Sequence, residues 1–170
     1  MKIFGIGLTR TGTTSLTKSL EILGYSAVHC PHSYEEIDKH DAATDTPVAA
    51  RFPILDYMYP NSKFIFTTRD IEDWIHSASS ISRNKEDPLW KLEGRLILWK
   101  SLVFNKEKFI HGYYSHHNFV MDYFKHRAKD LLILPIEEKN KWNLICGFLN
   151  KKIPKTYYPH LNKRYSLRSN

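Results

Sequence analysis

The stretch that decides the fold is KIFGIGLTRTGTTSL, residues 2–16. Residues 2–8 form a short apolar run that predicts a buried strand, and the turn after it closes on Gly12 and opens a helix. Backbone N–H groups in such a turn and at a helix N-terminus point toward one place, where the helix dipole also favours negative charge. The sequence therefore predicts an anion-binding loop at this point of the chain.

The spacing of Gly7 and Gly12 matches the phosphate-binding loop G-x-x-x-x-G-K-[ST], with one departure. Thr13 stands where that loop has a lysine. In nucleotide-hydrolysing enzymes and kinases, this lysine holds the terminal phosphates and the next hydroxyl binds magnesium. Because the cation here is Arg10 instead, we interpret the loop as a site that binds a doubly anionic group without a metal ion.

Length, composition and charge narrow the class of protein. A chain of 170 residues with 42% apolar residues predicts one globular domain over residues 1–164, followed by a loose tail at 165–170. The apolar runs are too short to span a membrane, and Cys30 and Cys146 lack pairing or metal-ligand spacing, so we expect reduced thiols in a cytoplasmic protein. The net charge of +7 favours anionic partners, but the basic residues are scattered, so we expect no nucleic-acid groove.

Strand patterns alternate with helix patterns, which predicts an α/β fold with a three-layer parallel β-sheet flanked by helices. Strands are expected at 2–8, 25–30, 42–45, 62–68 and 131–136, and helices at 13–23, 33–40, from Thr46 onward, 71–82, 141–149 and twice within 89–123 with a break near 105–112. Pro53 is expected to break or kink the helix that Thr46 caps. Ligands bind beyond the carboxyl ends of parallel strands, so residues 7–14, 44–47 and Arg69 should share one rim.

The first loop resembles the phosphosulfate loop of sulfotransferases that use 3′-phosphoadenosine 5′-phosphosulfate (PAPS). Their loop has the form [KR]-[ST]-G-T-T, which is matched here by Arg10, Thr11, Gly12, Thr13 and Thr14. The resemblance implies a P-loop NTPase-like sulfotransferase fold and PAPS as the sulfate donor. It also implies that Thr14 or Ser15 contacts the 5′-phosphate.

A second pair of residues has the spacing of the 3′-phosphate site in the same family. Arg69 follows the strand FIFTT, and Ser77 lies eight residues further on, in the next expected helix. A guanidinium grips phosphate through two parallel hydrogen bonds, and a serine hydroxyl adds one more. The alternative is that Arg69 pairs with Asp70 or Asp73 and that Ser77 is simply a small helix residue. The first loop favours the phosphate site.

A third segment concerns the catalytic base. Many cytosolic sulfotransferases carry a K-T-H-x-P segment whose histidine deprotonates the acceptor. Here residues 43–47 read ATDTP, so that Asp45 takes the position of the histidine and Ala43 that of the lysine. A carboxylate can act as a base, but an acid at this point is also favoured by the dipole of the following helix. His29 and His40 remain reserve candidates for the base.

Together these similarities imply a sulfotransferase that moves a sulfuryl group from PAPS to a hydroxyl or amine, with Arg10 and Asp45 as the catalytic residues. The acceptor is expected to be a small molecule, glycan or peptide. The histidines lack metal-ligand spacing, so no metal is expected; they include His29, His32, His40, His116 and His117.

Two alternatives stay open. One is a small-molecule or nucleotide kinase, against which Thr13 argues. The other is a catalytically silent nucleotide-binding protein of the same fold, favoured by Ala43 and by the lack of the family's late R-K-G loop, for which Lys163 and Arg164 are candidate substitutes. The aromatic residues of 90–123 belong either to the acceptor pocket or to the core. The sequence does not indicate an oligomeric state.

Overall fold

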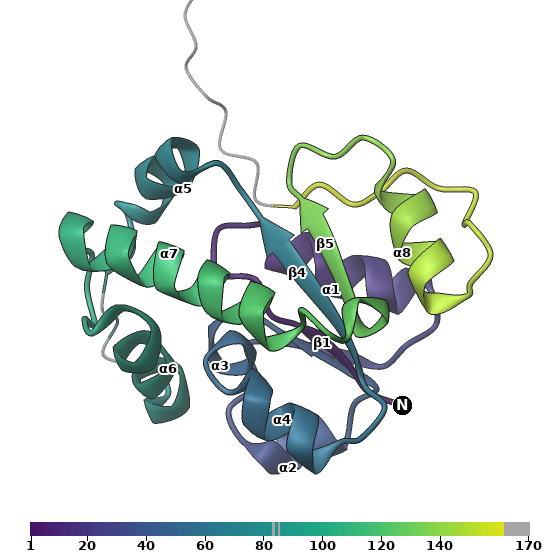
Figure 1. Cartoon of the computed structure of the whole chain (residues 1–170), viewed down its shortest axis with the longest axis horizontal. Coiled ribbons are helices and arrows are strands. Elements are labelled where there is room, and N and C mark those ends of the chain that lie inside the picture. The colour runs from purple at the N-terminus through teal and green to yellow at the C-terminus, as the bar shows by residue number, and fades with distance from the viewer. Residues whose placement is uncertain (83, 85, 162–170) are drawn as a thin grey trace, which may run out of the picture.

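Five parallel strands form one sheet in the order β2-β3-β1-β4-β5, with helices on both of its faces (Figure 1). The predicted α/β fold is therefore confirmed. The computed structural model describes residues 1–82, 84 and 86–161. The predicted tail at 165–170 and the candidates Lys163 and Arg164 lie outside the described residues.

The elements follow the predicted alternation of strands and helices. The strands are β1 (Ile3–Gly5), β2 (Ala27–His29), β3 (Ala42–Thr44), β4 (Lys63–Thr68) and β5 (Leu131–Pro135). The helices are α1 (Thr13–Ile22), α2 (Tyr34–Asp38), α3 (Thr46–Ala49), α4 (Phe52–Met58), α5 (Ile71–Ala78), α6 (Leu89–Trp99), α7 (Lys106–Tyr123) and α8 (Lys141–Leu149), and a short 3-10 turn, η1 (Ala128–Asp130), precedes β5.

Neighbouring residues on the central strand β1 face opposite layers, as the pleat of a strand requires. Phe4 packs with side chains of α3, α4 and α7, whereas Ile3 packs with side chains of α1 and α8. Figure 1 shows α7 crossing one face of the sheet, with α1 on the other. Both residues are completely buried, so the strand before the first loop is held from both sides.

A third cluster of buried side chains lies beside the first loop. It joins Leu8, just after β1, to Trp74 of α5, Trp99 of α6 and Phe109 of α7. The indole N–H of Trp74 donates a hydrogen bond to the carbonyl oxygen of Thr9 (2.9 Å). The core therefore extends directly under the loop and fixes its backbone.

Several predicted helix boundaries differ from the observed ones, and three of them bear on the site or on the packing of its helices. Asp45, and not Thr46, is the N-cap residue of α3. Helix α5 ends at Ala78 instead of residue 82. The break between α6 and α7 spans residues 100–105, and Asn105 caps α7 by accepting the N–H of Lys108 (3.0 Å).

The predicted break at Pro53 is confirmed, because α3 ends at Ala49 and Pro53 lies in the first turn of α4.

Gly112 lies inside α7 and has a packing role. A Cβ atom there would lie 2.4 Å from the carbonyl oxygen of Leu98. The absence of a side chain thus lets α6 and α7 approach each other closely.

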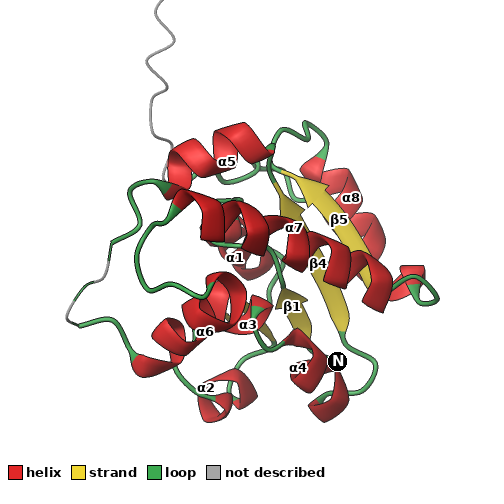
Figure 2. Cartoon of the chain, turned by 60° about the vertical axis from the view of Figure 1, so that its left-hand side comes forward, coloured by secondary structure: helices red, strands yellow, loops and turns green. Residues whose placement is uncertain are grey.

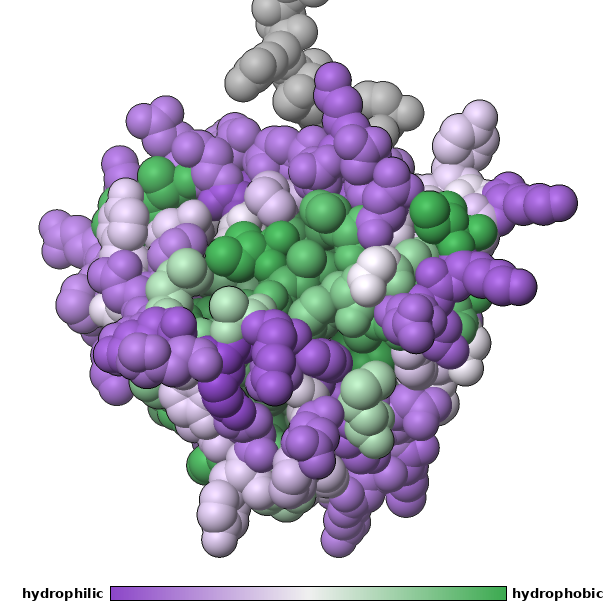
Figure 3. Space-filling model, turned by 45° about the vertical axis from the view of Figure 1, so that its right-hand side comes forward, coloured by the Kyte–Doolittle hydropathy of each residue, from purple (hydrophilic) through white to green (hydrophobic). Residues whose placement is uncertain are grey.

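The edge strand β5 and helix α8 lie on the side that Figure 3 brings forward, where apolar residues gather within a largely polar surface. Ile133 on β5 and Leu144 on α8 are both more than one-third exposed.

Within the described parts of the chain, no helix combines the length and apolar character needed to cross a bilayer.

Candidate functional site

A cavity of about 1170 Å³ lies at the carboxyl ends of the strands. Residues 9–15 line it together with His29 at the end of β2, Asp45 just after β3, Arg69 just after β4 and Ser77 on α5. The segments that follow four different strands thus meet at one cavity, as the parallel sheet predicts. The residues expected to be catalytic or to bind the donor all line it, whereas the reserve base His40 does not; they are Arg10, Thr11, Gly12, Thr13, Thr14, Ser15, Asp45, Arg69 and Ser77.

Gly7 allows the first loop to pass close to β4. A Cβ atom at this position would lie 1.9 Å from Oγ1 of Thr67 and 2.5 Å from its carbonyl oxygen, so no other residue fits without moving the strand. The hydroxyl of Thr11 donates to the carbonyl oxygen of Leu8 (2.6 Å) and lies 2.6 Å from Oγ1 of Thr67. The Thr11 hydroxyl therefore fastens the loop to β4.

The loop turns tightly through two residues with left-handed backbones. Gly12 has φ 97°, which suits glycine, whereas Arg10 has φ 71°, a conformation that costs free energy for a residue with a Cβ atom. The N–H of Leu16 bonds to the carbonyl oxygen of Gly12 (3.0 Å), and this bond begins the helical pattern of α1. The N–H groups before Leu16 are those that a helix N-terminus leaves for an anion.

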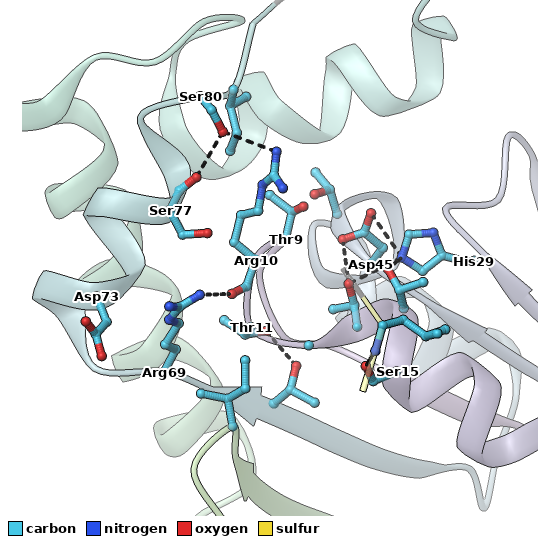
Figure 4. A pocket seen from close by; sticks show the side chains of 18 of the residues that line it. Thr9, Arg10, Thr11, Ser15, His29, Asp45, Arg69, Asp73, Ser77 and Ser80 are labelled. Carbon is cyan, nitrogen blue, oxygen red and sulfur yellow. Dashed lines mark hydrogen bonds and ion pairs between the residues drawn. The ribbon is translucent and has the colours of Figure 1, made fainter. Parts of the chain in front are cut away.

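The two segments that are expected to bind anions are joined by a hydrogen bond. The guanidinium of Arg69 donates to the carbonyl oxygen of Arg10 (3.3 Å), and the guanidinium of Arg10 donates to the hydroxyl of Ser80 (3.4 Å). Figure 4 shows Arg10 extending toward Ser80, which lies just after α5, with Ser77 on α5 itself. Two guanidinium groups and Ser77 therefore border one part of the cavity.

The alternative role of Arg69, an ion pair with a neighbouring acid, is not observed. Neither Asp70 nor Asp73 lies within 4.0 Å of the Arg69 guanidinium nitrogens in the described structure. Asp70 instead caps α5 by accepting the backbone N–H groups of Glu72 (2.9 Å) and Asp73 (3.2 Å). Arg69 thus retains N–H donors for a ligand in the cavity.

Asp45 has an unusual backbone and a side chain directed at the first loop. Its φ of 87° and ψ of −174° lie in a region that is essentially restricted to glycine. Its carboxylate makes no hydrogen bond to the N-terminus of α3. Instead, Oδ1 accepts the hydroxyl of Thr13 (3.2 Å), and Oδ2 lies 3.7 Å from Nε2 of His29. The carboxylate therefore belongs to the cavity and does not cap its own helix.

His29 completes this group. Its Nε2 lies 3.3 Å from Oγ1 of Thr13 and 3.2 Å from Oγ1 of Thr14, and its side chain is 33% exposed, compared with 7% for Asp45. The other reserve histidine, His40, lies away from the cavity, with Nδ1 2.8 Å from the carbonyl oxygen of Glu36. Within the described ranges, no three His, Cys, Asp or Glu side chains are grouped to hold a metal ion.

The C-terminal segment borders the cavity near α1. The hydroxyl of Ser15 accepts the backbone N–H of Leu161 (3.0 Å), so this predicted phosphate contact already has a partner within the chain.

Two residues that line this side of the cavity have shifted pKa values. Burial raises the pKa of Tyr158 to about 12 and keeps its phenol neutral. Burial also lowers the pKa of Lys141, whose ammonium donates to the carbonyl oxygens of Ile136 (2.7 Å) and Glu138.

Sequence reasoning missed several charged residues at the cavity, among them Asp87, Lys91 and Arg95. Their i, i+4, i+8 spacing is that of residues on one face of a helix, and this spacing was the sequence pattern that could have identified them.

No aromatic residue of 90–123 lines the cavity. Trp99 and Phe109 are 1% and 0% exposed and belong to the core, whereas Tyr114 is 50% exposed and belongs neither to the core nor to the cavity lining.

Comparisons with known proteins agree with this geometry. The family described as "Sulfotransferase domain" matches residues 2–40 and 32–167. The chain belongs to the sulfotransferase family. The chain is also 23% identical, over 215 aligned residues, to a protein of Aspergillus versicolor called Ava biosynthesis cluster protein M, and the alignment covers 95% of this chain and 80% of that protein. The family resemblance predicted from the first loop is therefore confirmed for almost the whole length.

Proposed function

We propose that this sulfotransferase takes PAPS as its donor and transfers the sulfuryl group to a hydroxyl or amine of a small molecule, glycan or peptide. The observation that carries the proposal is the hydrogen bond between Arg69 and the backbone of Arg10, because it joins two anion-binding segments at one cavity. The donor carries anionic groups at its 3′ and 5′ positions. Two linked sites for anions fit that pattern, and a single phosphate-binding loop does not.

Each half of the donor has a chemically suitable partner. The N–H groups around Gly12 and Thr13 and the hydroxyl of Thr14 would hold the 5′-phosphosulfate at the start of α1. Arg69 and Ser77 would hold the 3′-phosphate, the first through its guanidinium fork and the second through its hydroxyl. The cavity volume, about 1170 Å³, exceeds the usual range of about 300–1,000 Å³ for one ligand, which leaves space for an acceptor.

When bound, the donor supplies the sulfuryl group, whose bond to the bridging oxygen breaks as a bond to the acceptor oxygen or nitrogen forms. The leaving phosphate keeps the electron pair, and the acceptor loses one proton. Arg10 and the N–H groups of the loop stabilise the negative charge that grows on the leaving oxygen. The loop is preorganised for this role by the bonds of Thr11 and Trp74 to its backbone.

The acceptor proton goes to Asp45 in this proposal. Its carboxylate lines the cavity next to Thr13, on the first loop, where the sulfuryl group would lie. His29 lies 3.7 Å from Asp45 and is much more exposed, so it provides a path for the proton to the solvent. Asp45 and His29 thus form an acid–base pair in which the buried member faces the reaction.

Thermal shift tests the donor assignment directly. A concentration of 3′-phosphoadenosine 5′-phosphate (PAP) near 100 times its Kd should raise Tm by roughly 5–10 °C in the presence of EDTA. ATP with magnesium should give a much smaller shift. Stabilisation by ATP and magnesium alone would support a kinase instead. If PAP binds but labelled PAPS is never consumed across a broad acceptor panel, the catalytically silent interpretation gains.

A further inference from the structure

Helix α6 brings a group of charges to the acid–base side of the cavity. It packs beside α3, and a Cβ atom at Gly94 would lie only 3.3 Å from Cγ2 and the carbonyl oxygen of Thr46 (Figure 2). This close approach sets the cavity-facing side of α6 next to the residue that follows Asp45. Lys91 and Arg95 line the cavity from α6, and Asp87 does so from just before the helix.

The thiol of Cys30 lies within electrostatic reach of several of these charges. Burial raises the pKa of Cys30 to about 12, and the negative charge of Asp45 acts in the same direction. The positive charges of Lys91 and Arg95 act on the same thiol in the opposite direction. One side chain therefore lies within electrostatic reach of both the proposed base and the two cations of α6.

Two of the three charged groups on this side already have several partners. Asp87 accepts the ammonium of Lys91 (2.7 Å) and the backbone N–H of Asn84 (3.1 Å), and pairs with Arg95 (3.2 Å). Nη1 of Arg95, whose side chain is 8% exposed, also donates to the carbonyl oxygens of Ser82 and Leu102 (both 3.1 Å). Asp87 therefore has little acceptor capacity left, and Nη1 of Arg95 is fully used.

Lys91 is the more exposed of the two cations, and it retains donors. An ammonium has three N–H bonds, and within the described residues Lys91 uses one of them, for Asp87. The side chain is 28% exposed, so the remaining donors reach the cavity and the solvent. Its stem is held in place by the ion pair with Asp87, which lowers the entropy cost of holding a ligand.

The charge balance of this group is positive. Burial by itself would raise the pKa of Asp87, but the hydrogen bonds from Lys91 and Asn84 and the charge of Arg95 outweigh it and lower the pKa. Asp87 is therefore ionised and neutralises one of the two cations, which leaves a surplus positive charge. Ile81 is the single apolar side chain that lines the cavity among residues 77–95 that the structure describes, so this side suits a polar ligand.

We propose that Lys91, held by Asp87 and backed by Arg95, binds a carboxylate on the acceptor while the acceptor hydroxyl or amine meets Asp45. The inference rests on the proposed function and narrows its acceptor to small polar molecules that carry a carboxylate. A flat apolar phenol or steroid has no complementary surface on this side. Arg95 acts as a positioning residue, because its donors hold the segments at Ser82 and Leu102 beneath the group.

Calorimetric titration of the protein saturated with PAP tests this proposal. The probes are two pairs of compounds in which one member has a carboxylate: glucuronate against glucose, and 4-hydroxybenzoate against 4-hydroxybenzamide. Binding of the carboxylate should be about ten-fold tighter within at least one pair, a difference of about 1.4 kcal/mol, because the carboxylate gains a charge-assisted hydrogen bond. Lys91→Met should abolish that preference, and Lys91→Arg should restore part of it.

The matched control is Lys100→Met, which removes an exposed lysine outside the cavity lining, just after α6, and should leave the preference unchanged. PAP affinity serves as the check on folding, and it should stay within about two-fold of wild type in all three variants. Equal binding within both pairs, or a preference that survives in Lys91→Met, overturns the carboxylate site. Failure of the wild-type protein to bind PAP overturns the proposed donor instead.

Discussion

Arg69 donates a hydrogen bond from its guanidinium to the carbonyl oxygen of Arg10, at 3.3 Å. The acceptor in this bond is a residue held at φ 71°, so the arginine after β4 supports the strained turn of the loop after β1. A ligand that binds the guanidinium of Arg69 should therefore also affect the backbone of the first loop. A ligand that binds the loop should likewise affect the position of Arg69. The two anion sites are expected to be coupled.

Arg69→Ala should weaken the binding of PAP by roughly ten- to a hundred-fold, the loss expected for a charge-assisted hydrogen-bond pair. The affinity for AMP, which has no 3′-phosphate, should change by less than about three-fold. Titration of both ligands into both proteins measures the difference. An equal loss for PAP and AMP would contradict the assignment of the 3′-phosphate to Arg69 and would indicate damage to the loop.

Gly7→Ala should lower Tm strongly, because the added Cβ atom would lie 1.9 Å from Oγ1 of Thr67 and 2.5 Å from its carbonyl oxygen. We expect a cost of about 2–4 kcal/mol, comparable to severe overpacking. The control is Gly147→Ala in α8, where an added Cβ atom meets nothing within 4 Å. That variant should be neutral or more stable by up to about 1 kcal/mol, since alanine favours a helix. Scanning calorimetry of the three proteins distinguishes these outcomes.

Asp45→Gly should separate stability from activity. The backbone of Asp45 lies in a region that costs other residues about 1–3 kcal/mol, so glycine should raise the free energy of unfolding by about 1 kcal/mol. The same change should lower the rate of sulfate transfer by about 10²–10⁴-fold, the usual contribution of a catalytic base. Asp45→Asn removes the charge without relieving the strain and should lose activity alone. A normal rate in Asp45→Asn would exclude Asp45 as the base.

His116 should make the fold less stable in mild acid. Burial lowers its pKa to about 4 from an ordinary value of 6.5, although its hydrogen bond with the carbonyl oxygen of Ile6 (2.8 Å) opposes the shift. Between these two values the unfolded chain binds a proton that the folded chain does not, so stability falls as the pH drops from 6.5 toward 4. The full difference amounts to roughly 3 kcal/mol.

Urea unfolding at several pH values measures this dependence. His116→Gln keeps a donor for Ile6 but does not titrate, so its stability should depend less on pH over this range. His126→Gln, an exposed control beyond α7, should keep the wild-type dependence. Identical pH dependence in His116→Gln and the wild type would show that the buried imidazole is not responsible.

The fold could be predicted from the sequence because its signals are local. Each strand is a short apolar run, and the left-handed backbone of Gly12 is a local requirement of the turn that opens α1. The spacing from Arg69 to Ser77 is also local, since it lies within one strand end and the helix that follows. These features depend little on how distant parts of the chain pack.

The remaining parts of the site depend on tertiary contacts. The sequence does not reveal that the hydroxyl of Thr11 turns inward to Thr67, nor that Asp45 turns away from its own helix toward Thr13. Lys91 reaches the cavity because Gly94 lets α6 approach α3. Such a contact between segments some fifty residues apart leaves no pattern within either one.

The strand order has a consequence for how this protein can diverge. The loop follows the central strand β1, with β4 on one side and β3 on the other. The proposed 3′-phosphate residues follow β4, and the proposed base and acceptor residues follow β3 or lie on α6 beside α3. The residues on the β4 side and those on the β3 and α6 side can therefore change independently during evolution. Substitutions around Lys91 can give the family a new acceptor while the donor half is passed on unchanged.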